Sequence, residues 1–266
     1  MSKFTLSAEQ IKANYNKFIN SIDKLFPSRA ESLKRMYKEL GEERLLFAPA
    51  STAEHFHNAI PGGYIDHVLR VMEFAIKEYN HYTSLGLDVS GFTKEELAFA
   101  AMHHDLGKLG FPGEGKESYI YNKSEWHRKN QGKEYEINEH IPFALVQDRS
   151  LFLLQSFQIP CSWNEWLGIR IHDGVYDDAN KSYWISHQLK SKLRNVLPQI
   201  LHNADIAASR FEFERWNKKA SKLKIDRIEN VNLADVNAER KTEQAKRSSK
   251  NQINEQLSST FQDIFK

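Results

Sequence analysis

The sequence predicts an all-α protein that carries a small β-hairpin-like insertion and a polar C-terminal helical tail. Apolar residues recur at helical spacing through most of residues 7–215. One segment, residues 110–138, interrupts this pattern with four glycines and several aromatic residues. From residue 217 the chain becomes polar, with eleven Lys or Arg and seven Asp or Glu. We therefore expect an N-terminal helical segment over 1–47 packed on the core, a main helical domain over 48–216, and a charged helical tail or linker over 217–266.

The composition is that of a globular protein. Apolar residues make up 40% of the 266 residues and charged residues 27%, which excludes a disordered, collagen-like or coiled-coil chain as a whole. The net charge of +2 is too balanced to indicate nucleic-acid binding by itself. A single cysteine, Cys161, forms no internal disulfide and favours a reducing compartment. Because no apolar run could span a membrane and the start of the chain lacks a signal peptide, we expect a cytoplasmic protein without a membrane partner.

Two helices are expected in the N-terminal segment. Ser7 is a start signal, Pro27 interrupts the pattern, and the second helix should stop at Leu40-Gly41. The first helix carries apolar residues at helical spacing, namely Ile11, Tyr15, Phe18, Ile19 and Ile22.

The next two helices precede the insertion. A turn-rich stretch over 48–63 leads into a long helix near 64–84. Its apolar stripe consists of Ile65, Val68, Leu69, Met72, Ala75 and Ile76. Thr93, with Glu96 three residues later, caps a further helix that we expect to end at Gly107.

Within the insertion, residues 119–121 and 134–137 are expected to pair as a hairpin. Helices should resume at 148–158 and 163–172 and then over 187–215, the last interrupted at Pro198. The tail is interpreted as a solvated helix or linker, or else as a segment for an anionic partner or for homo-oligomer formation. Its amphipathic end would be formed by Ile253, Leu257, Phe261, Ile264 and Phe265.

Histidine is the residue type that points to chemistry. All eleven histidines lie between His55 and His202. Divalent metals require imidazole nitrogens and carboxylates that converge from different helices. Four places on expected helices offer such groups: His67, the pair His104-Asp105, His172 and Asp205.

The order of these residues resembles the HD superfamily of metal-dependent phosphohydrolases. In that family a His, a His-Asp pair and a distant Asp come from separate helices, and the similarity here covers roughly residues 48–215. Pro-Gly-Gly upstream of His67 and the His-Asp-x-Gly-Lys run at His104 sharpen it. The resemblance implies an HD-domain helical bundle, with a divalent metal (Mn, Mg, Co, Ni or Fe) held by His67, His104, Asp105 and Asp205.

Closer similarity is to phage-type HD hydrolases and to the catalytic domains of HD-type 3′–5′ exoribonucleases. The run from Ala48 through His57 to His67 is shared with both, whereas the 119–151 segment is more similar to the phage-type group. Exoribonucleases of this kind usually carry an OB-fold ahead of the HD domain. The 47 mostly helical residues found here leave no room for one, which argues against a processive exonuclease.

Further roles follow from the same resemblance. Binuclear relatives add two histidines, and His172 fits one of them, whereas Val146 occupies the place of the other. His140 could reach the metals only in a shifted register. We therefore expect one tightly bound ion and a possible second ion near His172 and His140. The alternatives are a phosphate contact or a helix-end residue for His172 and a loop residue for His140.

Four other residues are candidates for contact with the substrate. Lys108 would reach the scissile phosphate, and His57 would lend a proton to the leaving group or stabilise the turn. Arg149 and Arg70 are candidate phosphate clamps. The expected function is hydrolysis of a phosphomonoester or phosphodiester in a nucleotide, a short oligonucleotide or a nucleic-acid end, by metal-activated water. A nucleotide-binding HD module without activity and an HD-fold di-iron oxygenase are the alternatives.

Overall fold

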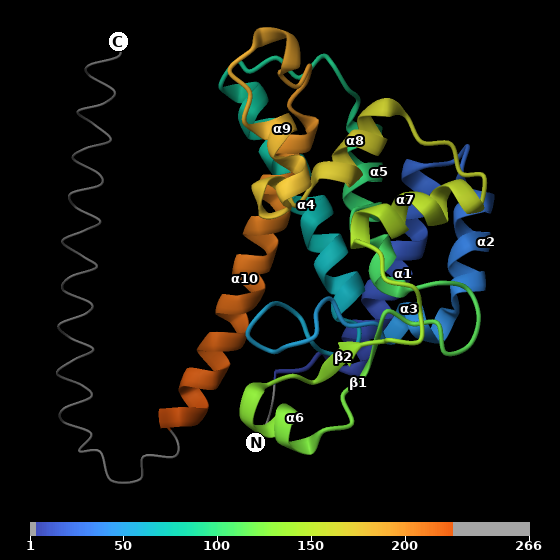
Figure 1. The fold of residues 1–266 in the computed structure, drawn as a ribbon, viewed down its shortest axis with the longest axis vertical. Coiled ribbons are helices and arrows are strands. Elements are labelled where there is room, and N and C mark those ends of the chain that lie inside the picture. The colour runs from blue at the N-terminus through green and yellow to red at the C-terminus, as the bar shows by residue number, and fades with distance from the viewer. Residues whose placement is uncertain (1–3, 226–266) are drawn as a thin grey trace, which may run out of the picture. The chain divides into compact units, whose positions relative to one another are not determined.

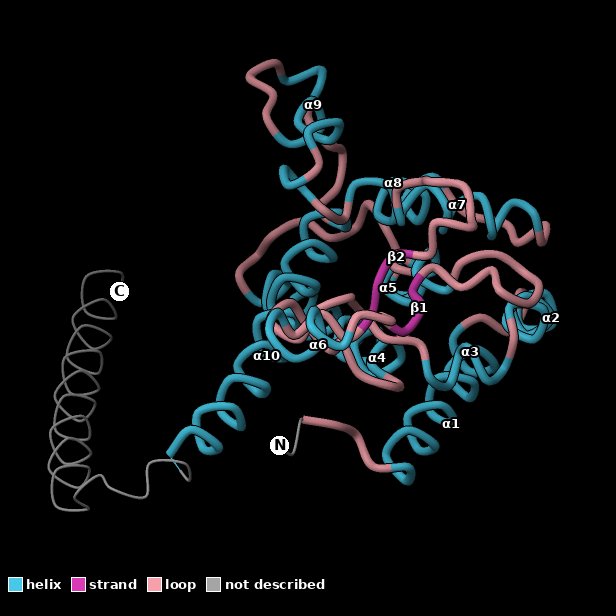
Figure 2. Tube along the Cα trace, turned by 60° about the horizontal axis from the view of Figure 1, so that its bottom comes forward, coloured by secondary structure: helices cyan, strands magenta, loops and turns pink. Residues whose placement is uncertain are grey.

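The predicted all-α fold class is confirmed by the structure, a computed structural model (Figures 1 and 2). It describes the backbone of residues 4–225 and the side chains of residues 4–217, and residues 4–219 belong to one compact unit. The α-helices are α1 (Ala8–Leu25), α2 (Ala30–Leu40), α3 (Glu42–Phe47), α4 (Gly63–Ser84), α5 (Lys94–His103), α6 (Glu125–Gln131), α7 (Val146–Ser156), α8 (Trp163–Ile171), α9 (Lys181–Trp184) and α10 (Leu197–Ile225). Two three-residue strands, β1 (Tyr119–Tyr121) and β2 (Tyr135–Ile137), accompany them.

The two expected N-terminal helices are present as α1 and α2. Ser7 and Gln10 form a capping box at the start of α1, which satisfies backbone donors that would otherwise lack partners. Phe18 and Ile22 bury one face of this helix, and the ring of Phe26 packs edge-on against Phe99 of α5. The N-terminal helices therefore belong to the same hydrophobic core as α4 and α5.

The centre of the core is formed by α4 and α5. Thr93 and Glu96 form the expected capping box of α5, whose residues Leu97 to His103 are all buried. The helix ends at His103, before the expected end at Gly107, and a 3-10 turn follows over Leu106–Leu109. His104 and Asp105 consequently lie at a change of backbone direction, where their side chains project out of the helix end.

The predicted hairpin is also present. Strands β1 and β2 pair antiparallel with Tyr119 opposite Ile137, and α6 lies between them in the sequence. The loop over residues 110–118, between the 3-10 turn and β1, is joined to the core by Arg44 of α3. Arg44 Nη1 donates to the carbonyl oxygens of Leu109 and Phe111 at the start of this loop. Figure 2 shows the strands as the short magenta element among the helices.

The prediction of one helix over 187–215 is wrong. Residues 187–196 contain only a 3-10 turn, Leu189–Ser191, and α10 begins at Leu197. Pro198 lies in the first turn of α10, where backbone N–H groups have no acceptor within the helix, so the proline is compatible with helix initiation. Residues 226–266 lie outside the described part of the chain. The prediction for the tail beyond residue 225 therefore also lies outside the described residues. No helix among the described residues is both long and apolar enough to cross a membrane.

Candidate metal centre

His67 lies one turn inside α4, and two glycines set the start of that helix. Gly62 has a φ of +74°, which disfavours other residues. A Cβ on Gly63 would lie 2.1 Å from the carbonyl oxygen of Asn58, so only glycine allows the 51–62 loop to approach this closely. The Gly-Gly pair therefore fixes where His67 enters the protein interior, and its side chain is fully buried.

His104 and Asp105 are placed by close contact between the end of α5 and the start of α7. A Cβ on Gly107 would lie 2.2 Å from the carbonyl oxygen of Val146. Ser150 of α7 accepts a hydrogen bond from the Gly107 N–H and donates one to the His104 carbonyl oxygen. This packing holds the His-Asp turn against α7 and turns both side chains toward α4.

The four predicted ligands meet at one point. His67 Nε2 lies 3.1 Å from Asp205 Oδ1 and 3.5 Å from Asp105 Oδ2. His104 Nε2 lies 3.4 Å from Asp105 Oδ2 and 3.9 Å from Asp205 Oδ1. Donor atoms about 2.1 Å from a shared ion are separated by about 3.0 to 3.4 Å. The observed separations therefore fit a shared divalent ion.

The histidine tautomers agree with this fit. His104 Nδ1 lies 2.8 Å from the carbonyl oxygen of Ala101, and His172 Nδ1 lies 2.8 Å from that of Ile169. Because a carbonyl oxygen only accepts, each Nδ1 carries a proton, and Nε2 is the nitrogen of each ring that is left to bind a metal. The Nε2 atoms of His67 and His104 are buried without a hydrogen-bond partner. Such orphaned acceptors, beside two carboxylates, suit a metal ion.

Glu212 is a site residue that the sequence interpretation missed. Its carboxylate is buried on α10, and both oxygens lie 3.2 Å from His67 Nδ1. The signal available in the sequence was its spacing, because Glu212 follows Asp205 by two helical turns and lies on the same face of α10.

The two candidate histidines for a second ion have different surroundings. His172 is buried after the end of α8, with Nε2 3.9 Å from Asp105 Oδ1, and His104, Asp105 and His172 form a second possible ligand group. Asp105 thus directs one oxygen toward His67 and the other toward His172. His140 is exposed in the loop after β2 and belongs to none of the three possible ligand groups among the described residues.

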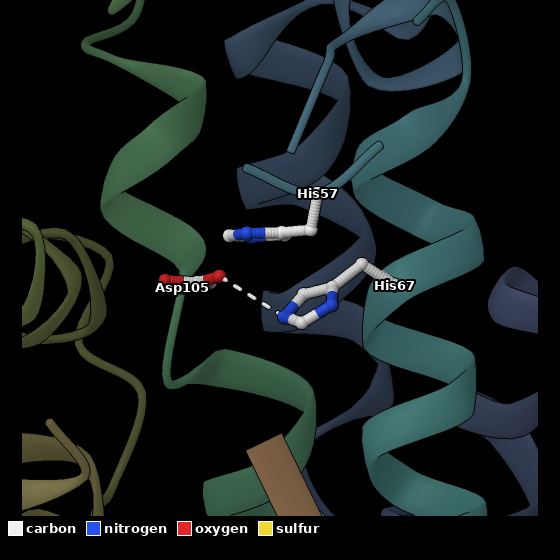
Figure 3. A group of neighbouring side chains, drawn as sticks. All are labelled: His57, His67 and Asp105. Carbon is white, nitrogen blue, oxygen red and sulfur yellow. Dashed lines mark ion pairs between the residues drawn. The ribbon is translucent and has the colours of Figure 1, made fainter. Parts of the chain in front are cut away.

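Lys108 and His57 lie on the side of the cluster that faces the pocket. Lys108 Nζ lies 2.6 Å from Asp105 Oδ2 and 3.4 Å from His57 Nε2. Figure 3 shows the His57 and His67 rings and the Asp105 carboxylate gathered around a common space, from the 51–62 loop, α4 and the end of α5.

Burial and the neighbouring charges shift the pKa values of His57 and Lys108 from their ordinary values. Burial and the neighbouring Lys108 ammonium hold the pKa of His57 well below its usual value. Burial alone would lower the pKa of Lys108, but the Asp105 carboxylate outweighs burial and raises it. At neutral pH the pair is therefore a neutral imidazole beside an ammonium.

The two predicted arginine clamps have other partners. Arg149 is buried, and its Nη1 donates to the Gly107 carbonyl oxygen and to Ser118 Oγ. Arg70 forms ion pairs with Asp66 and Glu212. The structure thus joins Arg149 to the loops around the insertion and Arg70 to the far side of His67, and a phosphate contact by either arginine stays a prediction.

A pocket of about 820 Å³ opens directly onto the cluster, and Asp205, His57 and Lys108 line it. Other parts of its wall come from the 50–56 loop, β2, the turn after α8 and the middle of α10. Its lining also includes the aromatic rings of Phe56, Tyr119, Tyr176 and Phe213 and the guanidinium group of Arg210. Phe56 and Tyr176 are 54% and 80% exposed, so their rings are available to a ligand.

The fold and the site define the chain as a helical protein with a candidate His/Asp metal centre beneath a pocket. Comparison with family models, curated proteins and solved structures gave no match for the chain.

Proposed function

We propose that this chain is a divalent-metal-dependent phosphohydrolase that cleaves a phosphoester of a nucleotide, a short oligonucleotide or a nucleic-acid end. One observation carries the proposal: donor atoms of His67, His104 and Asp205 lie within 4.8 Å of one another, at a pocket that Lys108 also lines. Asp105 completes the set of donors. Donors alone would suit many metalloproteins, and the adjacent cation favours an anionic substrate.

The ion and the side chains would contribute different parts of the hydrolysis reaction. A bound divalent ion would lower the pKa of a water ligand and polarise a phosphoryl oxygen. His67, His104, Asp105 and Asp205 would hold it. Lys108, at the mouth of the cluster, is placed to offset negative charge that develops on the phosphoryl oxygens.

His57 is suited to act as a neutral hydrogen-bond acceptor at Nε2, because burial and the Lys108 ammonium lower the pKa of its imidazole. The expectation that His57 donates a proton to the leaving group is less compatible with that shift. Its Nε2 lies 3.4 Å from Lys108 Nζ, so it can accept a hydrogen bond from the ammonium and orient it beside the pocket.

The pocket supports a substrate of nucleotide size. A volume of about 820 Å³ falls within the range of small-molecule sites. Exposed Phe56 and Tyr176 rings offer surfaces on which a flat base can stack. Arg210 is the other cationic side chain of the lining besides Lys108, which favours one or two phosphates over a long charged strand.

The decisive experiment is a metal-supplemented turnover screen. Protein stripped of metal is reloaded separately with Mn²⁺, Mg²⁺, Co²⁺, Ni²⁺ or Fe²⁺ and assayed on mononucleotides, cyclic dinucleotides and short single strands. Metal-dependent release of phosphate or of a nucleotide is expected. It should be lost in His104→Ala but kept in the control His140→Ala, which removes an exposed histidine outside the cluster.

Three other results would each reject the proposal. Nucleotide binding without turnover, under every metal, would indicate a binding module. Two irons per chain with an oxygen-dependent reaction would indicate the oxygenase. Equal turnover in the wild type and in His104→Ala would separate the activity from this centre.

A further inference from the structure

Behind the metal centre, on the Nδ1 side of His67, lies a network of buried and half-buried charges. Glu212 contacts His67 Nδ1 with both carboxylate oxygens and also forms an ion pair with Arg70. Arg70 in turn lies 3.0 Å from Asp66, and Asp66 lies 2.8 Å from Arg215. The network thus contains two carboxylates and two guanidinium groups, which balance each other in charge.

The network also reaches the loop that carries His57. Asn58 Nδ2 donates to Asp66 Oδ2 at 2.8 Å, and Asn58 Oδ1 accepts from Arg215 at 2.9 Å. Asn58 has a φ of +42°, a left-handed conformation that needs support from its surroundings. One set of contacts therefore connects α4, α10 and the 51–62 loop, the segments that supply His67, Asp205 and His57.

Glu212 differs from the groups that orient the other two cluster histidines. His104 and His172 direct Nδ1 to neutral backbone carbonyls within their own helices. His67 directs Nδ1 to a charged carboxylate on another helix. A carboxylate partner fixes the ring orientation and makes the opposite nitrogen a stronger donor to a metal than a carbonyl partner does.

We infer that Glu212 is a positioning residue of the metal centre: it holds His67 with the proton on Nδ1, so that Nε2 faces the ion. Asp205 and Glu212 lie two turns apart on α10 and contact opposite nitrogens of the ring. Arg70 compensates the charge of Glu212 and keeps its carboxylate directed at His67. This inference rests on the metal centre of the proposed function, but it does not depend on which substrate is cleaved.

The test is metal affinity, measured without turnover. Co²⁺ is titrated into metal-free protein and followed by its visible absorption in the wild type, Glu212→Gln and Glu214→Gln. Loss of an outer-shell partner of this kind typically weakens metal binding by about 10- to 100-fold, and we expect an increase of that size in the dissociation constant for Glu212→Gln. Glu214 is the matched control, because it lies on the same helix and pairs with Arg210 away from the cluster.

A second readout reports the ring itself. In Zn²⁺-loaded protein with ¹⁵N-labelled histidine, the wild type should show a His67 Nδ1–H that is strongly hydrogen-bonded to a carboxylate, and Glu212→Gln should shift this Nδ1 signal toward that of an N–H bonded to a neutral acceptor. A residue that only stabilises the fold would not change this spectrum selectively. An unchanged His67 Nδ1 signal together with unchanged Co²⁺ affinity would overturn the inference.

A double variant covers the case in which Glu212→Gln does not fold. Glu212→Leu with Arg70→Met removes both charges together, which is better tolerated than leaving one buried partner alone. Weakened Co²⁺ binding in this folded variant supports the inference, and wild-type affinity overturns it.

The outcomes also distinguish this inference from the proposed function. Co²⁺ binding without hydrolysis of any substrate rejects the function alone, while the Glu212 variants still decide the inference. Hydrolysis with no effect of Glu212 rejects the inference alone. A wild type that binds no metal rejects both.

Discussion

Asp205 and Glu212 contact opposite nitrogens of one imidazole ring. Asp205 Oδ1 lies 3.1 Å from Nε2 of His67, and Glu212 Oε1 lies 3.2 Å from Nδ1. Both carboxylates come from α10, which runs beside α4 in this part of the molecule (Figure 1). The position of α10 along α4 therefore sets the geometry of the candidate metal centre.

Removal of either long-range ligand should weaken metal binding. Because His67 and Asp205 each supply a donor atom, we expect His67→Ala and Asp205→Asn to raise the metal dissociation constant by more than about 100-fold. Isothermal titration of metal-free protein measures it. His81→Ala, an exposed histidine on the same helix, is the control. Unchanged affinity in both ligand variants would show that the four-residue set is wrong.

The His-Asp pair should be essential for hydrolysis but not for folding. His104→Ala and Asp105→Asn remove donors that the ion needs to activate water, so turnover should fall by about 100-fold or more. Circular dichroism checks that helix content is unchanged. Full turnover in a folded variant of either residue would falsify the assignment of the pair.

Turnover should depend on His172, whereas neither turnover nor the tightly bound ion should depend on His140. His172 lies 3.9 Å from Asp105, whereas His140 is exposed outside the cluster. We expect one tightly bound ion, with His140→Ala leaving it and most activity intact and His172→Ala mainly lowering turnover. Metal analysis of purified protein together with steady-state kinetics gives both values. Two tightly bound ions, one of them lost in His140→Ala, would contradict this expectation.

His103 should make the metal-free protein sensitive to acid. Burial lowers its pKa to about 3, while the unfolded chain has an ordinary histidine. As pH falls below about 6.5, the unfolded state takes up a proton that the folded state refuses. The free energy of unfolding should then decrease by about 1.4 kcal/mol per pH unit down to about pH 3 from this residue.

Urea unfolding of metal-free protein between pH 7 and pH 4 measures that dependence. His103→Asn keeps a donor for the Phe99 carbonyl oxygen and should show a shallower slope than the wild type. The exposed His140→Ala should keep the wild-type slope. Equal slopes in the wild type and in His103→Asn would mean that His103 is protonated in the folded state.

The local part of the fold was predictable because its signals are local. Capping boxes at Ser7 and Thr93 and the apolar stripe of 64–84 mark helices whatever lies around them. The predictions from the sequence fail where local signals compete with tertiary packing. Pro198 predicts an interruption of a helix but lies in the first turn of α10. Helix α5 is predicted to continue to Gly107 but ends at His103, before the His-Asp pair.

By itself, the sequence determined the helical class, the hairpin and the residue types of the centre, since these follow from spacing along the chain. The packing of distant segments brings His67 to Asp205, places Glu212 in contact with the same ring, and gives Arg70 and Arg149 partners outside the pocket. These contacts join segments far apart in the sequence, and they form because the apolar faces of the helices must be buried together. The packing of those faces, which no single helix encodes, brings the donor atoms within reach of one ion.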